Sequence, residues 1–315
     1  MTIFGYFLSS EEHSPKELIR QAVLAERAGF EALWISDHYH PWIDEQGQSS
    51  FVWSVIGALS EAVSLPVTTA VTCPLVRMHP AVAAQAAATA QILLDGRFRF
   101  GVGTGEALNE HVVGHAWPPA HDRRSMLEEA IEIIRELWSG RLTTYHGEFY
   151  DVETARLYSL PEQPPPIYVS GLGAKSAEMA GRIGDGYIST MPDQELLDVF
   201  HKSGGAGKPT AGGLKVCWGT DEEEARATAH RLWPTSAITG EASQLLPQPR
   251  HFEELARLVT PESLTLPCGP DPEDHLQGIQ EYVDAGFDEI YIAQIGPQQE
   301  EFFEFYSTVV LPQLR

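Results

Sequence analysis

Short apolar runs alternate with longer amphipathic segments along almost the whole chain, and this alternation restricts the possible folds more than any other feature. Runs rich in β-branched and aromatic residues predict eight strands, at 2–9, 31–39, 66–75, 97–105, 166–173, 186–190, 214–220 and 289–296. Apolar residues recur at helical spacing between most of these runs, for example at 14–30, 80–95, 122–138, 175–183 and 273–285. Strands that read as continuous apolar runs are typical of a parallel sheet buried on both faces. We therefore predict an α/β fold, a (β/α)8 TIM barrel.

The length of 315 residues fits one barrel domain over residues 1–315 with two insertions. The segment 142–160 alternates like a hairpin around His146 and Gly147, and the segment 234–268 carries several Pro, Ser and Thr residues. We expect the glycine-rich stretch SGGAGKPTAGG at 203–213 to be mobile.

Composition restricts the partners. The chain has 21 Lys plus Arg against 44 Asp plus Glu, a formal charge of −23, which opposes binding to nucleic acid or to an anionic membrane surface. No run approaches 18 consecutive apolar residues, so we expect no membrane span. The three cysteines, Cys73, Cys217 and Cys268, lie far apart and imply no disulfide framework. We expect a cytoplasmic protein with a small-molecule substrate.

Polar residues gather where the predicted strands end, which is where barrel enzymes carry their active sites. Trp42 is the large indole among them. The others are Glu11, Glu12, Asp37, His38, His40, Thr72, Cys73, Arg77, Thr104, Glu106, Asn109, Glu110, Ser170, Gly171 and Gly173.

The pair His38 and His40 could indicate zinc, but such sites need further ligands at later strand ends, and the runs IYVSGLG, GYIST and IYIAQIG supply none. We therefore expect no metal, and we interpret His38 as a general base. The runs GVGTG and GLGAKS both fail the G-x-G-x-x-G pattern, because Glu106 and Ser176 stand at the third glycine position. Their glycines serve either ordinary turns or a close backbone approach to a flat or anionic group. Because SGLGAKS lies at the start of a predicted helix, its backbone amides also form a reasonable phosphate-binding site.

The predicted site combines a base, a carboxyl group at Glu106, the indole of Trp42 and an anion-binding loop. It contains no nucleophile paired to a base. Such a set fits proton transfer coupled to the chemistry of an organic cofactor.

Five motifs carry a family resemblance: GYFLSSEE, SDHYHPW, TCPLVRMHPAVAAQ, GVGTGEALNE and YVSGLGAKSAEMAGRIGDGY. They resemble the luciferase-like barrel superfamily, in particular its branch that uses the deazaflavin coenzyme F420. That branch includes F420-dependent glucose-6-phosphate dehydrogenases and secondary alcohol dehydrogenases. The likeness implies an F420-dependent oxidoreductase that moves a hydride between C5 of the deazaflavin and an alcohol/carbonyl pair or an activated double bond, and it implies a homodimer.

The resemblance also implies roles for single residues. His38 would take the proton of the substrate hydroxyl, and Trp42 would pack beside the reacting carbon. Glu106 would lie near N1 of the deazaflavin, and Glu11 would lie close to the substrate. A cis peptide bond would join Ala70 to Val71 against the cofactor. The residues expected to hold the cofactor are Asp37, Ala70, Val71, Cys73, Thr104, Gly105, Asn109, Ser170, Gly171, Leu172 and Gly173.

The positions at which this sequence differs from the family pattern concern the substrate-binding residues. Where sugar-phosphate enzymes of the branch carry a lysine soon after strand six, this chain has Asp193, and the segment 258–269 has neither Lys nor Arg. A phosphate dianion would then lack charged partners, so we do not expect glucose 6-phosphate. The cysteine of the alcohol branch falls on Pro261. An FMN-dependent monooxygenase is the alternative enzyme, although the acid pair Glu106 and Glu110 resembles the deazaflavin branch. A ligand-binding barrel without catalysis is the alternative outside enzymes.

Overall fold

The computed structural model describes residues 2–238 and 240–315. Its strands are β1 (Ile3–Leu8), β2 (Leu33–Ile35), β3 (Val67–Thr69), β4 (Phe98–Val102), β5 (Thr143–His146), β6 (Asp151–Ala155), β7 (Ile167–Ser170), β8 (Gly186–Ser189), β9 (Thr210–Val216) and β10 (Glu289–Gln294). Its α-helices are α1 (Pro15–Ala28), α2 (Val52–Ala62), α3 (Pro80–Leu93), α4 (Ala107–Glu110), α5 (Ala120–Trp138), α6 (Ala174–Ile183), α7 (Gln194–Phe200), α8 (Glu222–Leu232), α9 (Ala242–Leu245), α10 (Pro249–Ala256), α11 (Pro272–Ala285), α12 (Gln299–Phe305) and α13 (Leu311–Leu314).

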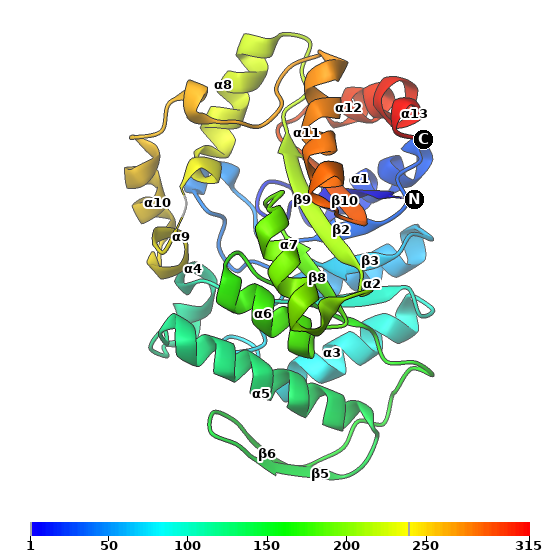
Figure 1. The fold of residues 1–315 in the computed structure, drawn as a ribbon, viewed down its shortest axis with the longest axis vertical. Helices are drawn as coiled ribbons and strands as arrows, with labels where there is room; N and C mark the ends of the chain where they lie inside the picture. The colour runs from blue at the N-terminus through cyan, green and yellow to red at the C-terminus, as the bar shows by residue number, and fades with distance from the viewer. Residues whose placement is uncertain (1, 239) are drawn as a thin grey trace.

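The predicted barrel is confirmed. Parallel strands close in the order β1-β10-β9-β8-β7-β4-β3-β2, with helices around them (Figure 1). The first and last strands complete the circle, since Ile3 pairs with Glu289 and Tyr6 with Ile292. Both ends of the chain therefore lie on the same side of the molecule (Figure 1).

Local signals in the sequence set the helix boundaries. The Ser14 side chain accepts a hydrogen bond from the backbone N–H of Glu17 at the start of α1, and Pro15 occupies the first turn. Gly29 ends this helix in the left-handed conformation with φ 93°. Buried Leu18, Ala22 and Ala25 form the face of α1 that packs on the barrel.

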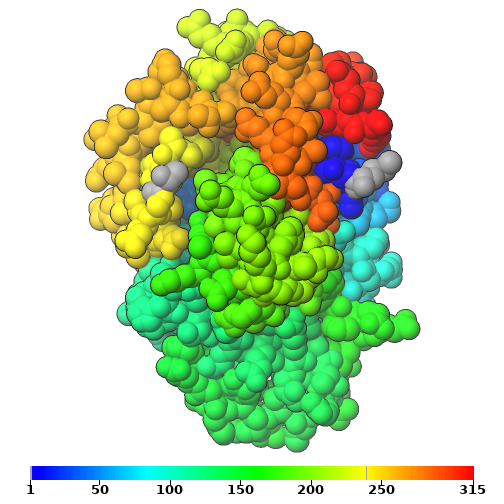
Figure 2. Space-filling view, viewed as in Figure 1, coloured from blue at the N-terminus to red at the C-terminus, as the bar shows by residue number. Residues whose placement is uncertain are grey.

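The hairpin expected within 142–160 is confirmed as β5 and β6, in which His146 pairs with Asp151. It lies beyond α5 in Figure 1. Part of the insertion 234–268 forms the short helices α9 and α10, which lie at the left edge of the molecule in Figure 1. Figure 2 shows this insertion, in yellow and orange, on the same face as α6 and α7 in green.

The expectation of a mobile segment is wrong for 210–213, which belongs to β9, and the predicted bounds of the seventh strand are wrong as well. β9 begins at Thr210 and ends at Val216, four residues earlier than expected. The two glycines of β9 serve close packing rather than mobility. A Cβ atom at Gly212 would lie 2.4 Å from Tyr282 Cδ1, and one at Gly213 would lie 2.7 Å from Trp34 Cζ3, so aromatic rings fill the space beside the strand.

Aromatic side chains fill the interior of the barrel. Trp34 stacks on Tyr291 with ring centroids 4.3 Å apart, and Tyr168, Ile188 and Ala211 pack in the same cluster. Trp34 and Phe7 also line the cavity described below, so this cluster forms its base. The barrel is a packed core with a cavity at one end, as is usual for this architecture.

Candidate active site

A cavity of about 550 Å³ lies at the carboxyl ends of the barrel strands. Its lining comes from the loops after β1, β2, β3, β4 and β7, from β9, and from the insertion. Every residue of the expected site except Asn109 belongs to this lining: Glu11, Asp37, His38, Trp42, Ala70, Val71, Cys73, Thr104, Gly105, Glu106, Ser170, Gly171, Leu172 and Gly173. The sequence pattern therefore brought distant residues to one place, as the rule for barrel enzymes predicts.

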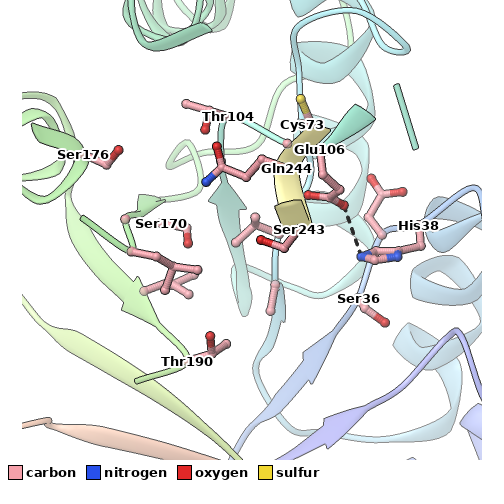
Figure 3. Close-up of a pocket in the computed structure, with 18 of the residues that line it drawn as sticks. Ser36, His38, Cys73, Thr104, Glu106, Ser170, Ser176, Thr190, Ser243 and Gln244 are labelled. Atoms are coloured by element: carbon pink, nitrogen blue, oxygen red, sulfur yellow. Dashed lines mark ion pairs between the residues drawn. The ribbon is translucent and has the colours of Figure 1, made fainter. Parts of the chain in front are cut away.

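His38 stands between two carboxyl groups. Its Nδ1 lies 3.5 Å from Glu11 Oε1, and its Nε2 lies 3.4 Å from Glu106 Oε1 (Figure 3). The ring of Trp42 is 5.1 Å away between centroids, and 12 % of the His38 side chain is exposed. A largely enclosed imidazole with a carboxyl group near each nitrogen can accept a proton at one nitrogen and release one from the other.

Glu11 is held so that one of its oxygen atoms faces the histidine. Its Oε2 accepts hydrogen bonds from Ser9 Oγ at 2.9 Å and from Ser36 Oγ at 2.8 Å. The residue is buried, with 2 % exposed. These two hydroxyl donors stabilise a buried carboxylate, which would otherwise be costly.

A buried ion-pair network lies beneath the loop after β2. Arg77 Nη2 lies 2.8 Å from Asp37 Oδ1, and its Nε lies 3.3 Å from Glu110 Oε1. Thr72 Oγ1 donates to Asp37 at 2.7 Å. Burial raises the pKa of Glu110, although hydrogen bonds and charge from Arg77 oppose this shift. Burial alone would lower the pKa of Arg77, but Asp37 and Glu110 raise it overall, so the guanidinium stays charged.

Two of the expected cofactor ligands have their polar atoms engaged elsewhere. Asp37 reaches the cavity lining, but its carboxylate is paired with Arg77 and Thr72. Asn109 does not line the cavity. Its Oδ1 accepts from the backbone N–H groups of Tyr39 and His40, and its Nδ2 donates to Glu106 Oε1 at 2.6 Å. Asn109 therefore ties the loop after β2 to Glu106, and its expected contact with the cofactor stays a prediction.

The glycines of both motifs allow the backbone to approach its neighbours closely. A Cβ atom at Gly103 would lie 2.7 Å from Val71 Cγ2, and one at Gly171 would lie 2.9 Å from the backbone nitrogen of Ala177. The peptide bond between Ala70 and Val71 is cis, as the resemblance implies. These glycines therefore allow the loops after β4 and β7 to pack closely against neighbouring segments of the protein.

Gly105 is the glycine of these loops that tolerates a side chain least. Its φ is +66°, and a Cβ atom would lie 2.5 Å from Cys73 Sγ. Gly105→Ala should therefore lower the free energy of unfolding by about 2–4 kcal/mol, because it combines left-handed backbone strain with overpacking. Gly114→Ala is the matched control, since Gly114 has φ +83° and no atom within 4 Å of such a Cβ. The control should lose only about 1–2 kcal/mol in urea unfolding, and equal losses would contradict the overpacking argument.

Sequence reasoning missed several lining residues. Lys215 and Trp233 lie at one part of the cavity, and Arg123 and Arg124 reach it from α5. Ser243 and Gln244 extend over it from α9, between His38 on one side and Ser170 on the other (Figure 3). The signal for Lys215 was a single lysine inside an otherwise apolar strand run, LKVCWG. The others come from helices and the insertion, where sequence spacing does not indicate which residues face the barrel end.

The described residues, 2–238 and 240–315, contain no group of three or more His, Cys, Asp or Glu side chains placed to hold a metal ion. Within the same ranges, none of the helices combines the length and apolar character needed to cross a bilayer.

Known proteins resemble this chain over nearly its whole length. A family model described as luciferase-like monooxygenase matches residues 2–289. The F420-dependent glucose-6-phosphate dehydrogenase of Microbacterium testaceum (strain StLB037) is 37 % identical over 99 % of this chain and 97 % of that protein. Its namesake from Nakamurella multipartita is 36 % identical over 99 % of this chain and 96 % of that protein.

One solved structure superposes closely on the whole chain. It is an F420-dependent secondary alcohol dehydrogenase in complex with an F420-acetone adduct, with a TM-score of 0.91 and 28 % identity over 100 % of this chain and 99 % of that one. An F420-dependent tetrahydromethanopterin reductase from Methanopyrus kandleri has a TM-score of 0.80 at 20 % identity, over 100 % of this chain and 99 % of that one, and supports the fold alone.

Proposed function

Because this chain belongs to the luciferase-like monooxygenase family, we propose that it is an oxidoreductase that uses coenzyme F420. The observation that carries the proposal is His38 between Glu11 and Glu106, beside an indole, at the open end of a barrel. The reaction interconverts an alcohol and a carbonyl compound. The alcohol loses a proton from its oxygen and a hydride from the same carbon.

The cavity fits a large, flat, anionic cofactor. Ala70, Gly103 and Gly105 line it with little or no side chain, which suits a planar ring lying close to the backbone. Ala70, Val71, Cys73, Thr104 and Gly105 would hold the ring, and Ser170 to Gly173 would hold its phosphate at the start of α6, where unpaired amides favour an anion. When bound, coenzyme F420 supplies the hydride acceptor, or the hydride donor in the reverse direction.

His38 acts as the proton acceptor for the substrate hydroxyl. Its Nδ1 lies 3.3 Å from the carbonyl oxygen of His40, and since a carbonyl oxygen can only accept, this contact favours the tautomer with its hydrogen on Nδ1. Nε2 then holds the lone pair that takes the hydroxyl proton. Orientation by a second group on the far nitrogen is what makes an imidazole an effective base.

The neighbouring groups position and shield this transfer. Glu106 Oε1 faces Nε2 and is itself held by a hydrogen bond from Asn109. A carboxyl group therefore lies beside the nitrogen that accepts the proton of the substrate hydroxyl. Glu11 holds the opposite side of the imidazole ring. Trp42 packs edge-on against Phe252 of α10 and excludes water from the side of the reacting carbon.

The substrate we propose is a small alcohol or carbonyl compound, or an activated double bond, other than glucose 6-phosphate. The curated relatives are named for that sugar phosphate. In this chain Asp193 stands after β8 and is the N-cap of α7, accepting from the Leu196 N–H, so no cation follows that strand directly. The described cavity lining has four Lys and Arg residues: Arg123 and Arg124 of α5, Lys175 beside the proposed phosphate site at the start of α6, and Lys215 of β9.

Titration with coenzyme F420 and with FMN tests the cofactor. We expect at least about tenfold tighter binding of F420, a difference of about 1.4 kcal/mol. A panel of secondary alcohols, aldehydes, enones and glucose 6-phosphate, followed by the loss or return of the deazaflavin absorbance, then tests the reaction. Tighter binding of FMN together with oxygen-dependent turnover would support the monooxygenase alternative instead. Turnover of glucose 6-phosphate above all other substrates would overturn the substrate proposal.

A further inference from the structure

Lys215 is a cavity-lining cation that the proposed mechanism does not use. It lies one residue before the end of β9, paired in register with Ala293 of β10, and its side chain is half-buried. Its Nζ is 4.5 Å from the ring centroid of Trp233, which also lines the cavity. The ammonium therefore sits over an indole wall with access to the cavity.

Among residues 2–238 and 240–315 the ammonium forms no ion pair and no hydrogen bond, and its described contact is the ring of Trp233. A lysine ammonium carries three donors, and burying it without an acceptor is unfavourable. The indole offsets only part of that cost, since one cation–π contact is a modest interaction.

The two nearby carboxylates are committed elsewhere. Glu11 is bonded to Ser9 and Ser36 and faces His38. Glu12 accepts from Trp233 Nε1 at 2.8 Å and from the Gly296 N–H at 2.6 Å. Burial lowers the pKa of Lys215 even though Glu11 and Glu12 raise it, so their charges do not fully compensate the ammonium. A further anionic group beside Nζ would complete that compensation.

We propose that Lys215 determines substrate specificity by binding a carboxylate of the substrate, so that the preferred substrates are hydroxy acids and the corresponding oxo acids. This inference rests on the proposed function, because it places one more group of the same substrate. A single lysine suits one negative charge, whereas a phosphate dianion needs several cations. Glu11 and Glu12 would oppose a second negative charge at this place. The flat faces of Trp42 and Trp233 suit the short apolar remainder of such an acid.

The test compares an acid with its uncharged isostere. Turnover of 2-hydroxybutanoate and of 2-hydroxybutanamide is measured with F420 for the parent chain and for Lys215→Met. The ratio of kcat/KM for the acid to that for the amide should fall about 100-fold in the variant, as expected when the partner of a buried anion is removed. Lys215→Arg, which keeps the charge, should recover part of the ratio. Lys202→Met is the matched control, because it removes one lysine charge from an exposed pair with Asp198 and should leave the ratio unchanged.

A binding measurement separates this inference from the proposed function. Calorimetric titration of 2-hydroxybutanoate into the cofactor-free chain should give heat with the parent and none with Lys215→Met, whether or not F420 binds. If the parent chain binds the acid but does not bind F420, the proposed function is wrong and the assignment of Lys215 stands. If F420 binds and alcohols turn over, but the acid-to-amide ratio is the same in parent and variant, the assignment of Lys215 is wrong. Preferred turnover of glucose 6-phosphate would also overturn it. If circular dichroism shows that Lys215→Met is unfolded, the same comparison is made with Lys215→Gln.

Discussion

The His38→Ala variant should lose about 100- to 10,000-fold in kcat/KM for alcohol oxidation while it binds coenzyme F420 nearly as tightly as the parent chain. The reason is geometric. His38 is placed between Glu11 and Glu106 at 3.5 Å and 3.4 Å, and no other described histidine lines the cavity. Without the imidazole, the hydroxyl proton has no acceptor of suitable basicity at that point. Hydride release from the carbon is then opposed, because it would leave a protonated carbonyl.

The measurement is steady-state kinetics with the best alcohol of the panel, together with fluorescence titration of F420. His40→Ala is the matched control, since His40 lies two residues away on the same loop and contacts the Leu108 carbonyl oxygen instead of the cavity. The control should keep its activity within a few-fold. Full activity in His38→Ala, or an equal loss in both variants, would remove His38 from the mechanism.

Arg77→Met should lower the free energy of unfolding by about 3–5 kcal/mol, because it leaves buried carboxylates without their shared cation. The Asp37 side chain has no exposed surface and that of Glu110 has 1 % exposed. In the parent chain the guanidinium bonds to both, and the Arg77 backbone N–H donates to Glu110 at 2.7 Å. Since the network supports the loop that carries His38, activity should fall together with stability.

Urea unfolding at neutral pH measures this loss. Arg182→Met provides a matched control, because Arg182 and Glu128 form a largely exposed pair 2.6 Å apart, and removing it should cost at most about 1 kcal/mol. Comparable losses in the two variants would show that the buried network contributes no more than a surface pair.

The deficit of Arg77→Met should shrink as the pH falls. Burial raises the pKa of Glu110 in the folded chain above its ordinary value of 4.5, so the folded state holds that proton more tightly than the unfolded state does. Stability from this group is fully present below pH 4.5 and is lost as the pH rises through the folded pKa. Without Arg77 the shift grows, so unfolding experiments between pH 5 and pH 7 should show the variant approaching the parent at the acid end. A constant difference would contradict the linkage.

The sequence alone determined the architecture and the region of the site. Hydrophobic periodicity is a local property, so short apolar runs and amphipathic segments identified eight strands and the helices between them. A closed parallel barrel brings all strand ends of one sense together, and for that reason His38, Trp42 and Glu106 could be placed in one cavity from their positions along the chain. The N-cap of α1 at Ser14 depends equally on local sequence, because the side chain bonds to the backbone N–H three residues later.

Only the tertiary structure decided what each polar group near the cavity does. Asn109 and Glu106 lie three residues apart at one strand end, yet one fixes a loop and the other faces His38. Lys215 faces the cavity, and the glycines of β9 pack against aromatic rings, because neighbours far away in the sequence occupy the space around them. Side-chain direction, burial and pairing depend on contacts between distant segments, and the spacing of residues along one chain does not contain that information.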